Sequence, residues 1–374
     1  MSAMMPVPHV DPIAAPGPLW MLRTLLLLTF FLHLLFMNTL LGGTVVAFAC
    51  GLRQKRSAFA AQLGRELGRV LPVVFAFTIT LGVAPLLFLQ VIYGHLLYAS
   101  SILMAVPWLG IILLVLLAYY GVYYFSLRGT TRPASTVAVL GVAALLLAGV
   151  AHIYTNNFTL MLTPERWLSL YAQHPSGWNL NWADPTVFPR YLHFVLAALA
   201  IAGLYLVVKG LRQRESAYGR WLIKQGAQLF VTPTMLNYLV GFWFLLKLPT
   251  DVRMTFLGRN AWATALLGIG MLLPLAAIVH LTLARSNESP VRQAVIGIGS
   301  GVLTVAIMVG IRDILRNAYL APIFRPEGLQ AAPQWGVITL FLVVFLAGLA
   351  TLFYMLRALA RAPKAAPAAA AGGK

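Results

Sequence analysis

Long apolar runs separated by short polar segments dominate this chain. Each run reaches the roughly 20 residues that a helix needs to cross the hydrocarbon core of a bilayer. We expect nine membrane-spanning helices, at residues 20–50, 71–97, 101–126, 134–155, 189–210, 221–246, 260–284, 292–315 and 334–358. Gly and Pro interrupt several runs, which membrane helices tolerate because neighbouring groups satisfy the freed backbone atoms. The pattern predicts an all-α polytopic membrane protein.

Composition agrees with this prediction and argues against a soluble protein and a nucleic-acid-binding protein. Of the 374 residues, 60% are hydrophobic and 10% are charged, whereas about 25% are charged in soluble domains. A net charge of +18 is typical of nucleic-acid binding, but the basic residues lie in short loops and form no clustered surface. Cys50 is the only cysteine, so neither an internal disulfide nor a covalently attached c-type haem is expected.

Basic residues concentrate in alternate loops, and this sets the expected orientation. They are Arg53, Lys55, Arg56, Arg65, Arg69, Arg128, Arg132, Lys209, Arg212, Arg214, Arg220, Arg285, Arg292, Arg357, Arg361 and Lys364. Cytoplasmic loops are enriched in Lys and Arg, so with nine spans the N-terminus is expected outside. The other side has fewer basic residues per loop and carries Asp11, Glu165, Asp184, Asp251 and Glu327.

Four of the seven histidines lie in or beside the outer half of the predicted spans: His33, His95, His152 and His193. An imidazole in hydrocarbon is costly and usually functional. Neutral imidazole is a common haem ligand, and helix bundles hold such ligands on facing helices. An interfacial histidine bonded to a backbone carbonyl is the alternative, and it applies most to His95 and His152, which lie at span ends.

Three stretches resemble subunit I of the cytochrome bd family of quinol oxidases. They are HLLFMNTLLGGTVVAF (33–48), GVAPLLFLQVIYG (82–94) and DPTVFPRYLHFVLAALAIAG (184–203). The resemblance, to a divergent and short member, implies a bd-type arrangement of two four-helix bundles plus one helix. It also implies a bacterial inner (cytoplasmic) membrane protein with a periplasmic N-terminus and a cytoplasmic C-terminus.

This arrangement divides the chain into segments. We expect an outer segment at 1–19, a first bundle at 20–155, an outer loop at 156–188, a second bundle at 189–315, an outer loop at 316–333, a ninth helix at 334–358 and a disordered cytoplasmic tail at 359–374. The loop 156–188 is rich in Trp, Pro and Asn and is predicted to be an interfacial flap.

The resemblance also implies haem ligands. His33 matches the ligand to a haem of the oxygen-reacting pair, and His193 matches one axial ligand of the low-spin haem b. For the second ligand to that haem, His152 competes with Met271, which lies about one turn deeper than the family's methionine and is alternatively a flexible core filler.

The stretch VGIRDILRNAYLAP (309–322) weakly resembles the family's Gly-Arg-Gln-Pro-Trp region but lacks the Gln-Pro-Trp. Arg312 and Arg316 are expected to pair with haem propionates, because the arginine fork matches a carboxylate. Two arginines at a propionate-free interface are the alternative.

Other features depart from the family. Gln90 stands where the family has a glutamate, and residues 102–125 contain no Asp or Glu. An amide cannot carry a proton by ionising, so these changes argue against oxygen reduction. The connection 247–260 is also too short for the family's long quinol-site loop.

We therefore expect a haem b-binding integral membrane electron-transfer subunit without oxygen reduction. It would hold one or two b-type haems and exchange electrons with a quinol or a periplasmic multihaem cytochrome c, beside another membrane subunit. Whether the chain is an oxidoreductase in its own right stays open. The alternatives are a functional bd-type terminal quinol oxidase subunit, and a haem-free transport or assembly subunit.

Overall fold

The computed structural model describes residues 7–8, 14–128, 133–287 and 290–361. Within these ranges, nine helices are long and apolar enough to cross a membrane. They are α1 (Leu19–Arg53), α2 (Ala58–Leu103), α3 (Ala105–Leu127), α4 (Ala134–Met161), α6 (Val187–Leu211), α7 (Ala217–Lys247), α9 (Ala261–Ser286), α10 (Val291–Leu320) and α11 (Trp335–Arg361). The prediction of an all-α polytopic membrane protein is confirmed.

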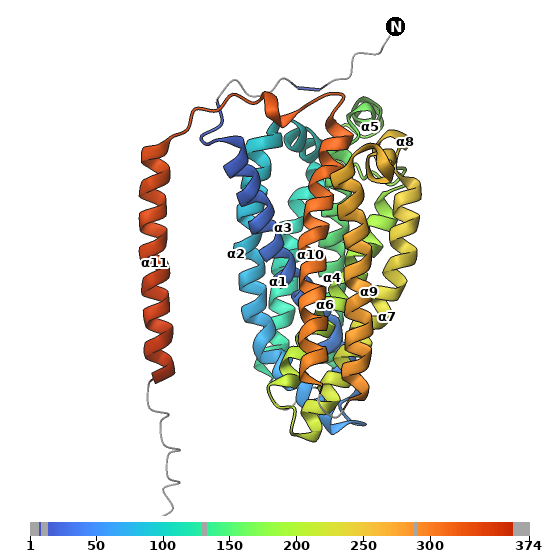
Figure 1. Cartoon of the computed structure of the whole chain (residues 1–374), viewed down its shortest axis with the longest axis vertical. Helices are drawn as coiled ribbons and strands as arrows, with labels where there is room; N and C mark the ends of the chain where they lie inside the picture. Colours follow the sequence, from blue (N-terminus) through green and yellow to red (C-terminus); the bar gives the residue numbers. More distant parts are fainter. Residues whose placement is uncertain (1–6, 9–13, 129–132, 288–289, 362–374) are drawn as a thin grey trace, which may run out of the picture.

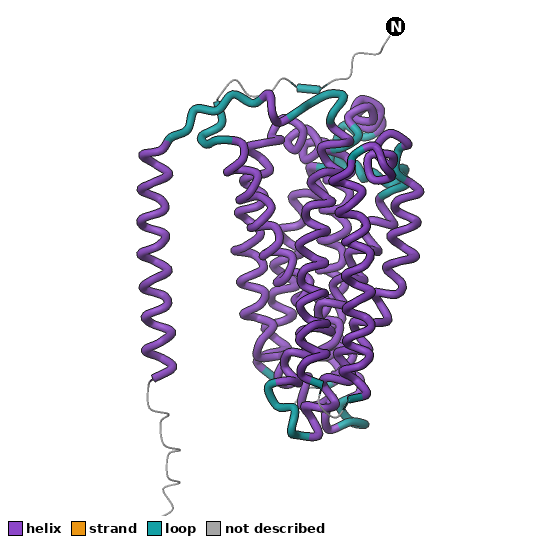
Figure 2. Tube along the Cα trace, viewed as in Figure 1, coloured by secondary structure: helices purple, strands orange, loops and turns teal. Residues whose placement is uncertain are grey.

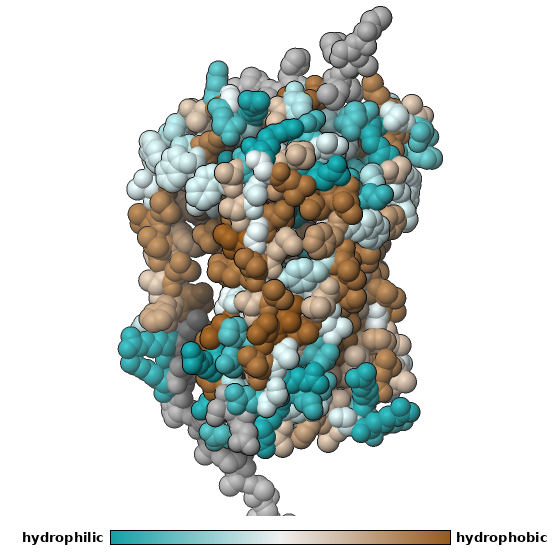
Figure 3. Space-filling model, turned by 45° about the vertical axis from the view of Figure 1, so that its right-hand side comes forward, coloured by the Kyte–Doolittle hydropathy of each residue, from teal (hydrophilic) through white to brown (hydrophobic). Residues whose placement is uncertain are grey.

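Short elements fill the connections between the long helices. They are η1 (Pro164–Arg166), α5 (Trp167–Gln173), α8 (Thr250–Met254), the π-helix η2 (Thr255–Arg259) and η3 (Pro326–Gly328). The long helices run alongside one another and the loops gather at the two ends (Figures 1 and 2). Hydrophobic side chains form a broad band between two more hydrophilic ends (Figure 3), as expected for contact with a lipid bilayer.

The two ends of the bundle differ in charge. We call the end with α5, α8 and the start of α1 the α5 end, and the other end the basic end (Figure 1). Most of the basic residues predicted to be cytoplasmic lie at the basic end. Two of them, Arg132 and Lys364, and the predicted outer Asp11 lie outside the described residues. The positive-inside rule still predicts a cytoplasmic basic end.

Two groups of helices meet through α1 and α6. Helices α1 to α4 pack against one another, as do α6, α7, α9 and α10, and α1 packs along α6. At this crossing the backbones come very close, because a Cβ on Gly42 would lie 2.1 Å from the carbonyl oxygen of Ala198. Glycine at 42 is therefore required for this helix pair to approach.

Eight predicted spans coincide with helices to within six residues at either end, but α2 begins much earlier than expected. Its first turns carry Arg65, Glu66 and Arg69 and lie beyond the apolar core, so hydropathy alone does not reveal them. Ser57 caps this extension by accepting a hydrogen bond from the backbone of Ala60 at 3.2 Å. Further along, α2 bends at Tyr93, whose φ and ψ are −125° and 25°.

The connection between α4 and α6 is a hydrogen-bonded cap on the α5 end. Asn179 donates to the carbonyl oxygen of Leu103 at 2.8 Å, and Asn156 accepts from the backbone N–H of Asn181 at 2.9 Å. Both loop asparagines are buried. The cap therefore holds the ends of α2 and α4 together.

The last long helix stands apart from the others (Figure 1). Nearly all of the described α11 side chains are exposed, and most are apolar. The loop before α11, rather than side-chain packing, holds this helix in place. In that loop Ala331 pairs with Ala15, which exchanges backbone hydrogen bonds with Gln330 and Ala332 at 2.8 and 2.9 Å. The predicted tail continues into residues 362–374, which lie outside the described residues.

Candidate functional site

Two apolar cavities lie inside the helix bundle, and each is lined by one of the predicted histidines. The His33 cavity, of about 340 Å³, lies among α1, α2, α3, α4, α6 and α10. The His193 cavity, of about 300 Å³, lies among α1, α6, α7, α9 and α10. Both fall in the size range of small-molecule and cofactor sites, roughly 300–1,000 Å³.

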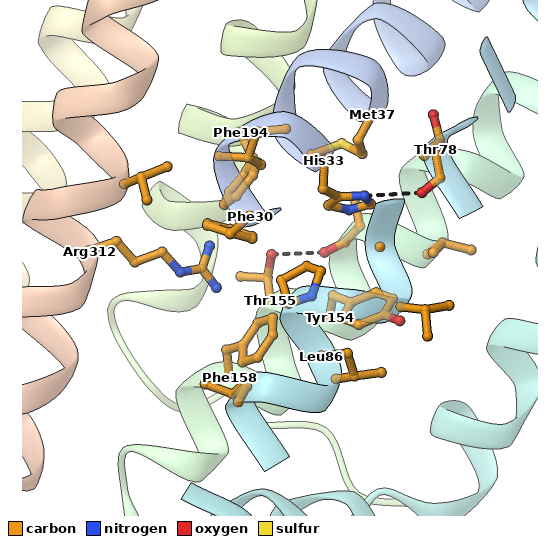
Figure 4. Close-up of a pocket in the computed structure, with 18 of the residues that line it drawn as sticks. Phe30, His33, Met37, Thr78, Leu86, Tyr154, Thr155, Phe158, Phe194 and Arg312 are labelled. Carbon is orange, nitrogen blue, oxygen red and sulfur yellow. Dashed lines mark hydrogen bonds between the residues drawn. The ribbon is translucent and has the colours of Figure 1, made fainter. Parts of the chain in front are cut away.

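The imidazole of His33 is oriented by a backbone carbonyl. Its Nδ1 lies 3.1 Å from the carbonyl oxygen of Thr78 on α2 (Figure 4). A neutral ring that donates from Nδ1 keeps the lone pair of Nε2 for a metal or another donor. Histidine ligands to metals commonly donate their other ring N–H to a carbonyl in this way.

Gly82 makes room for the same ring. A Cβ on Gly82 would lie 2.8 Å from Cε1 and 3.0 Å from Nδ1 of His33, closer than side-chain atoms normally approach. By contrast, a Cβ on Gly94 would meet only Tyr98, at 3.6 Å. Of these two glycines in α2, only Gly82 is required by its contacts, because His33 occupies the space beside it.

Aromatic rings surround the guanidinium of Arg312 on the far wall of the His33 cavity. The guanidinium carbon lies 4.9 Å from the ring centre of Phe30, 4.8 Å from that of Phe158 and 5.5 Å from that of Phe194. Figure 4 shows Arg312 pointing between these rings toward the cavity. Cation–π contacts of this kind partly compensate for removing a cation from water.

His193 lacks the support that His33 has. Its Nδ1 is buried and has no hydrogen-bond partner, while its backbone carbonyl accepts from Asn237 at 3.2 Å. Met271 on α9 and Met308 on α10 line the same cavity. The hydroxyl of Tyr238 donates to the carbonyl oxygen of Met271 at 2.5 Å and so fixes α9 against α7 at that level.

The two cavities share a wall. Phe30, Leu34, Arg190, Phe194, Val309 and Arg312 line both of them. Sequence reasoning missed Arg190, because a charged residue at the start of a span resembles an ordinary interfacial arginine. Its position three residues before His193 was the available signal, since residues i and i+3 share a helix face.

Within the part of the chain that the structure describes, Asp313 is the only Asp or Glu that lines a cavity, and it lines the His33 cavity. It is 3% exposed and forms ion pairs with Arg23, at 2.5 Å, and with Arg316. Asn317 also approaches it, at 3.5 Å. Two arginines therefore hold the two oxygens of Asp313, one on each.

Gln90 and His152, both predicted to bind the cofactor, line neither cavity. The ring of His152 packs against Trp182 and Tyr191, at 5.3 and 5.0 Å between ring centres, and its Nε2 lies 3.1 Å from the amide nitrogen of Asn156. The structure therefore brings together His33, His193, Met271, Arg312 and Arg316 around the two cavities, and leaves these two residues outside.

No protein-family model matches the chain, and no curated protein matches its sequence. Among the residues that the structure describes, no group of three or more His, Cys, Asp or Glu side chains is placed to hold a bare metal ion.

Proposed function

We propose that this chain is a haem b-binding integral membrane electron-transfer subunit, similar in plan to cytochrome bd subunit I. The observation that carries the proposal is the pair of adjoining apolar cavities, each lined by one intramembrane histidine and both lined by Arg190 and Arg312. Histidines and arginines inside a membrane are rare and mark functional sites. One haem b in each cavity is the arrangement that fits best.

The residues around each cavity fit such a group. In the His33 cavity, His33 would ligate the iron, and Arg312 and Arg316 would hold the propionates. In the His193 cavity, His193 and Met271 are the candidate axial ligands, because both line the cavity from different helices. Haem iron supplies one-electron chemistry when bound, and its potential depends on axial ligands, hydrogen bonds and burial.

The chain's own residues orient the ligands and exclude water. The apolar walls keep the local dielectric low, which strengthens the effect of each fixed charge. Asp313 is held between Arg23 and Arg316, and the cavity walls offer no further carboxylate in the described ranges. Walls with a single, ion-paired carboxylate fit electron transfer better than the proton-consuming reduction of oxygen.

Electron exchange would take place near the α5 end, toward which Arg190, His193 and Arg312 lie in their helices. On the predicted orientation this is the periplasmic face of a bacterial inner membrane. The proposed partners are a quinol or a periplasmic multihaem cytochrome c, together with a second membrane subunit that carries electrons onward.

The test is a reduced-minus-oxidised spectrum with a pyridine haemochrome assay on purified wild type and His193→Ala. The wild type should show a Soret band and the signature of haem b, and the variant should lose its low-spin component. A wild-type protein without a Soret band, after expression in a haem-replete host, would refute the proposal.

A further inference from the structure

Arg190 is a buried cation with no ion-pair partner within 4.0 Å among the described residues, although the carboxylate of Asp184 interacts with its charge at longer range. Its side chain is 9% exposed, and both Nε and Nη2 are buried without a hydrogen-bond partner. The ion pairs among the described residues involve other groups, and none joins Arg190 to a carboxylate within 4.0 Å. A charged group in this state is costly unless a ligand pairs with it.

The two unpaired nitrogens lie along the same edge of the Arg190 guanidinium. Nε and Nη2 are the two nitrogens on the same side of the planar fork, and this edge binds a carboxylate through two parallel hydrogen bonds. The face of the group is already covered, because the ring centre of Phe244 lies 4.9 Å from the guanidinium carbon. The remaining edge suits an anion with two oxygens.

The location of Arg190 extends this argument to both cavities. Arg190 and Arg312 are the two cations that line both the His33 cavity and the His193 cavity. Arg312 is surrounded by phenylalanine rings and likewise forms no ion pair within 4.0 Å. Arg316 differs, because it lines only the His33 cavity and is paired with Asp313.

We propose that Arg190, together with Arg312, forms a shared anion-binding site in which carboxylate groups of the ligands in both cavities meet. This inference rests on the proposed function, in which those ligands are haems and the carboxylates are their propionates. The shared site couples the two cavities, because the charge of either ligand changes the electrostatic environment of the other.

The test uses wild type, Arg190→Met, Arg190→Lys and, as a control, Arg259→Met. Arg259 is 58% exposed in η2 and lines neither cavity. For each protein, haem per chain, the midpoint potential of each spectral component and the propionate bending bands in resonance Raman spectra are measured. Unfolding midpoints are recorded on the same samples.

Arg190→Met should lower the midpoint potentials of both components, because the cation stabilises the more negative reduced form. A tenfold change in each reduction equilibrium corresponds to about 59 mV. Arg190→Lys should retain most of the potential but shift the propionate bands of both haems, because lysine keeps the charge and lacks the fork. Arg259→Met should match the wild type in every measurement.

Three results would overturn the inference: a shift confined to one component, propionate bands unchanged in Arg190→Lys, or equal effects of the Arg190 and Arg259 substitutions. If Arg190→Met does not fold, the Raman bands of Arg190→Lys decide the outcome alone. Failure of the proposed function is separate, since it is seen as missing haem in the wild type before any substitution is made.

Discussion

The His33 cavity and the His193 cavity hold their histidines in different ways. The ring of His33 is bonded to the carbonyl of Thr78 and fills the space beside Gly82. The ring of His193 has no partner for Nδ1, and a Cβ on Gly241 would approach it only to 3.9 Å. The first imidazole is fixed by a hydrogen bond and close packing between α1 and α2, whereas the second has no hydrogen bond at Nδ1 to fix its rotation.

This difference predicts different sensitivities. A hydrogen bond from the ring N–H to a carbonyl both orients a ligating imidazole and raises its basicity. The His33 site should therefore respond to changes in helix packing, and the His193 site to changes in its axial ligands. The following substitutions test this contrast, from the largest expected effect to the smallest.

Removing each imidazole should abolish one site and spare the other. In His193→Ala the low-spin haem component should disappear while the other component remains, and His33→Ala should show the reverse. Reduced-minus-oxidised spectra and haem content per chain measure this. His152→Ala is the matched control, because His152 lies outside both cavities. Loss of both components in either ligand variant would show that the two sites are not separate.

Enlarging Gly82 should disturb the His33 site alone. Gly82→Val places atoms where the ring of His33 lies, and overpacking of this kind costs about 1–3 kcal/mol. We expect loss of the His33 component and a lower unfolding midpoint, with the His193 component unchanged. Gly94→Ala is the control in the same helix, since its Cβ meets only ordinary contacts. Normal spectra in Gly82→Val would contradict the packing argument.

Replacing Met271 should change the His193 site without emptying it. Leucine conserves the volume at a cost below about 1.5 kcal/mol but removes the thioether. The low-spin signal should become high-spin while haem content stays constant, as seen by electron paramagnetic resonance. The comparison variant is Met308→Leu, because the methyl group of Met308 already packs against Gly270. A spin change in that variant instead would assign the ligand to Met308.

Substituting Gln90 should have the smallest effect. Gln90 lines neither cavity, so Gln90→Leu should alter the unfolding free energy by less than about 0.5 kcal/mol. Spectra and midpoint potentials should match the wild type. A shifted His33 component would place Gln90 in the site after all, as the resemblance to the oxidases implied.

The spans could be predicted from the sequence because the bilayer imposes a length and a composition on each of them. The start of α2 could not be predicted in this way, since its first turns carry Arg65, Glu66 and Arg69 and extend beyond the hydrocarbon region. His33 and His193 were found because an imidazole is conspicuous in an apolar run. Whether a side chain faces a cavity depends on helix rotation and packing, which place Arg190 on the cavity walls and leave Gln90 and His152 off them.

The contact between Gly42 and Ala198 sets how closely two helices approach each other. It joins α1, which carries His33, to α6, which carries His193, and it does so through backbone atoms that have no rotamers with which to adjust. A methyl group at position 42 would push α1 and α6 apart, and with them the two histidines. Under the proposed function, the distance between the two cavities would govern the rate of electron transfer between them, while the side chains around each haem would govern its potential.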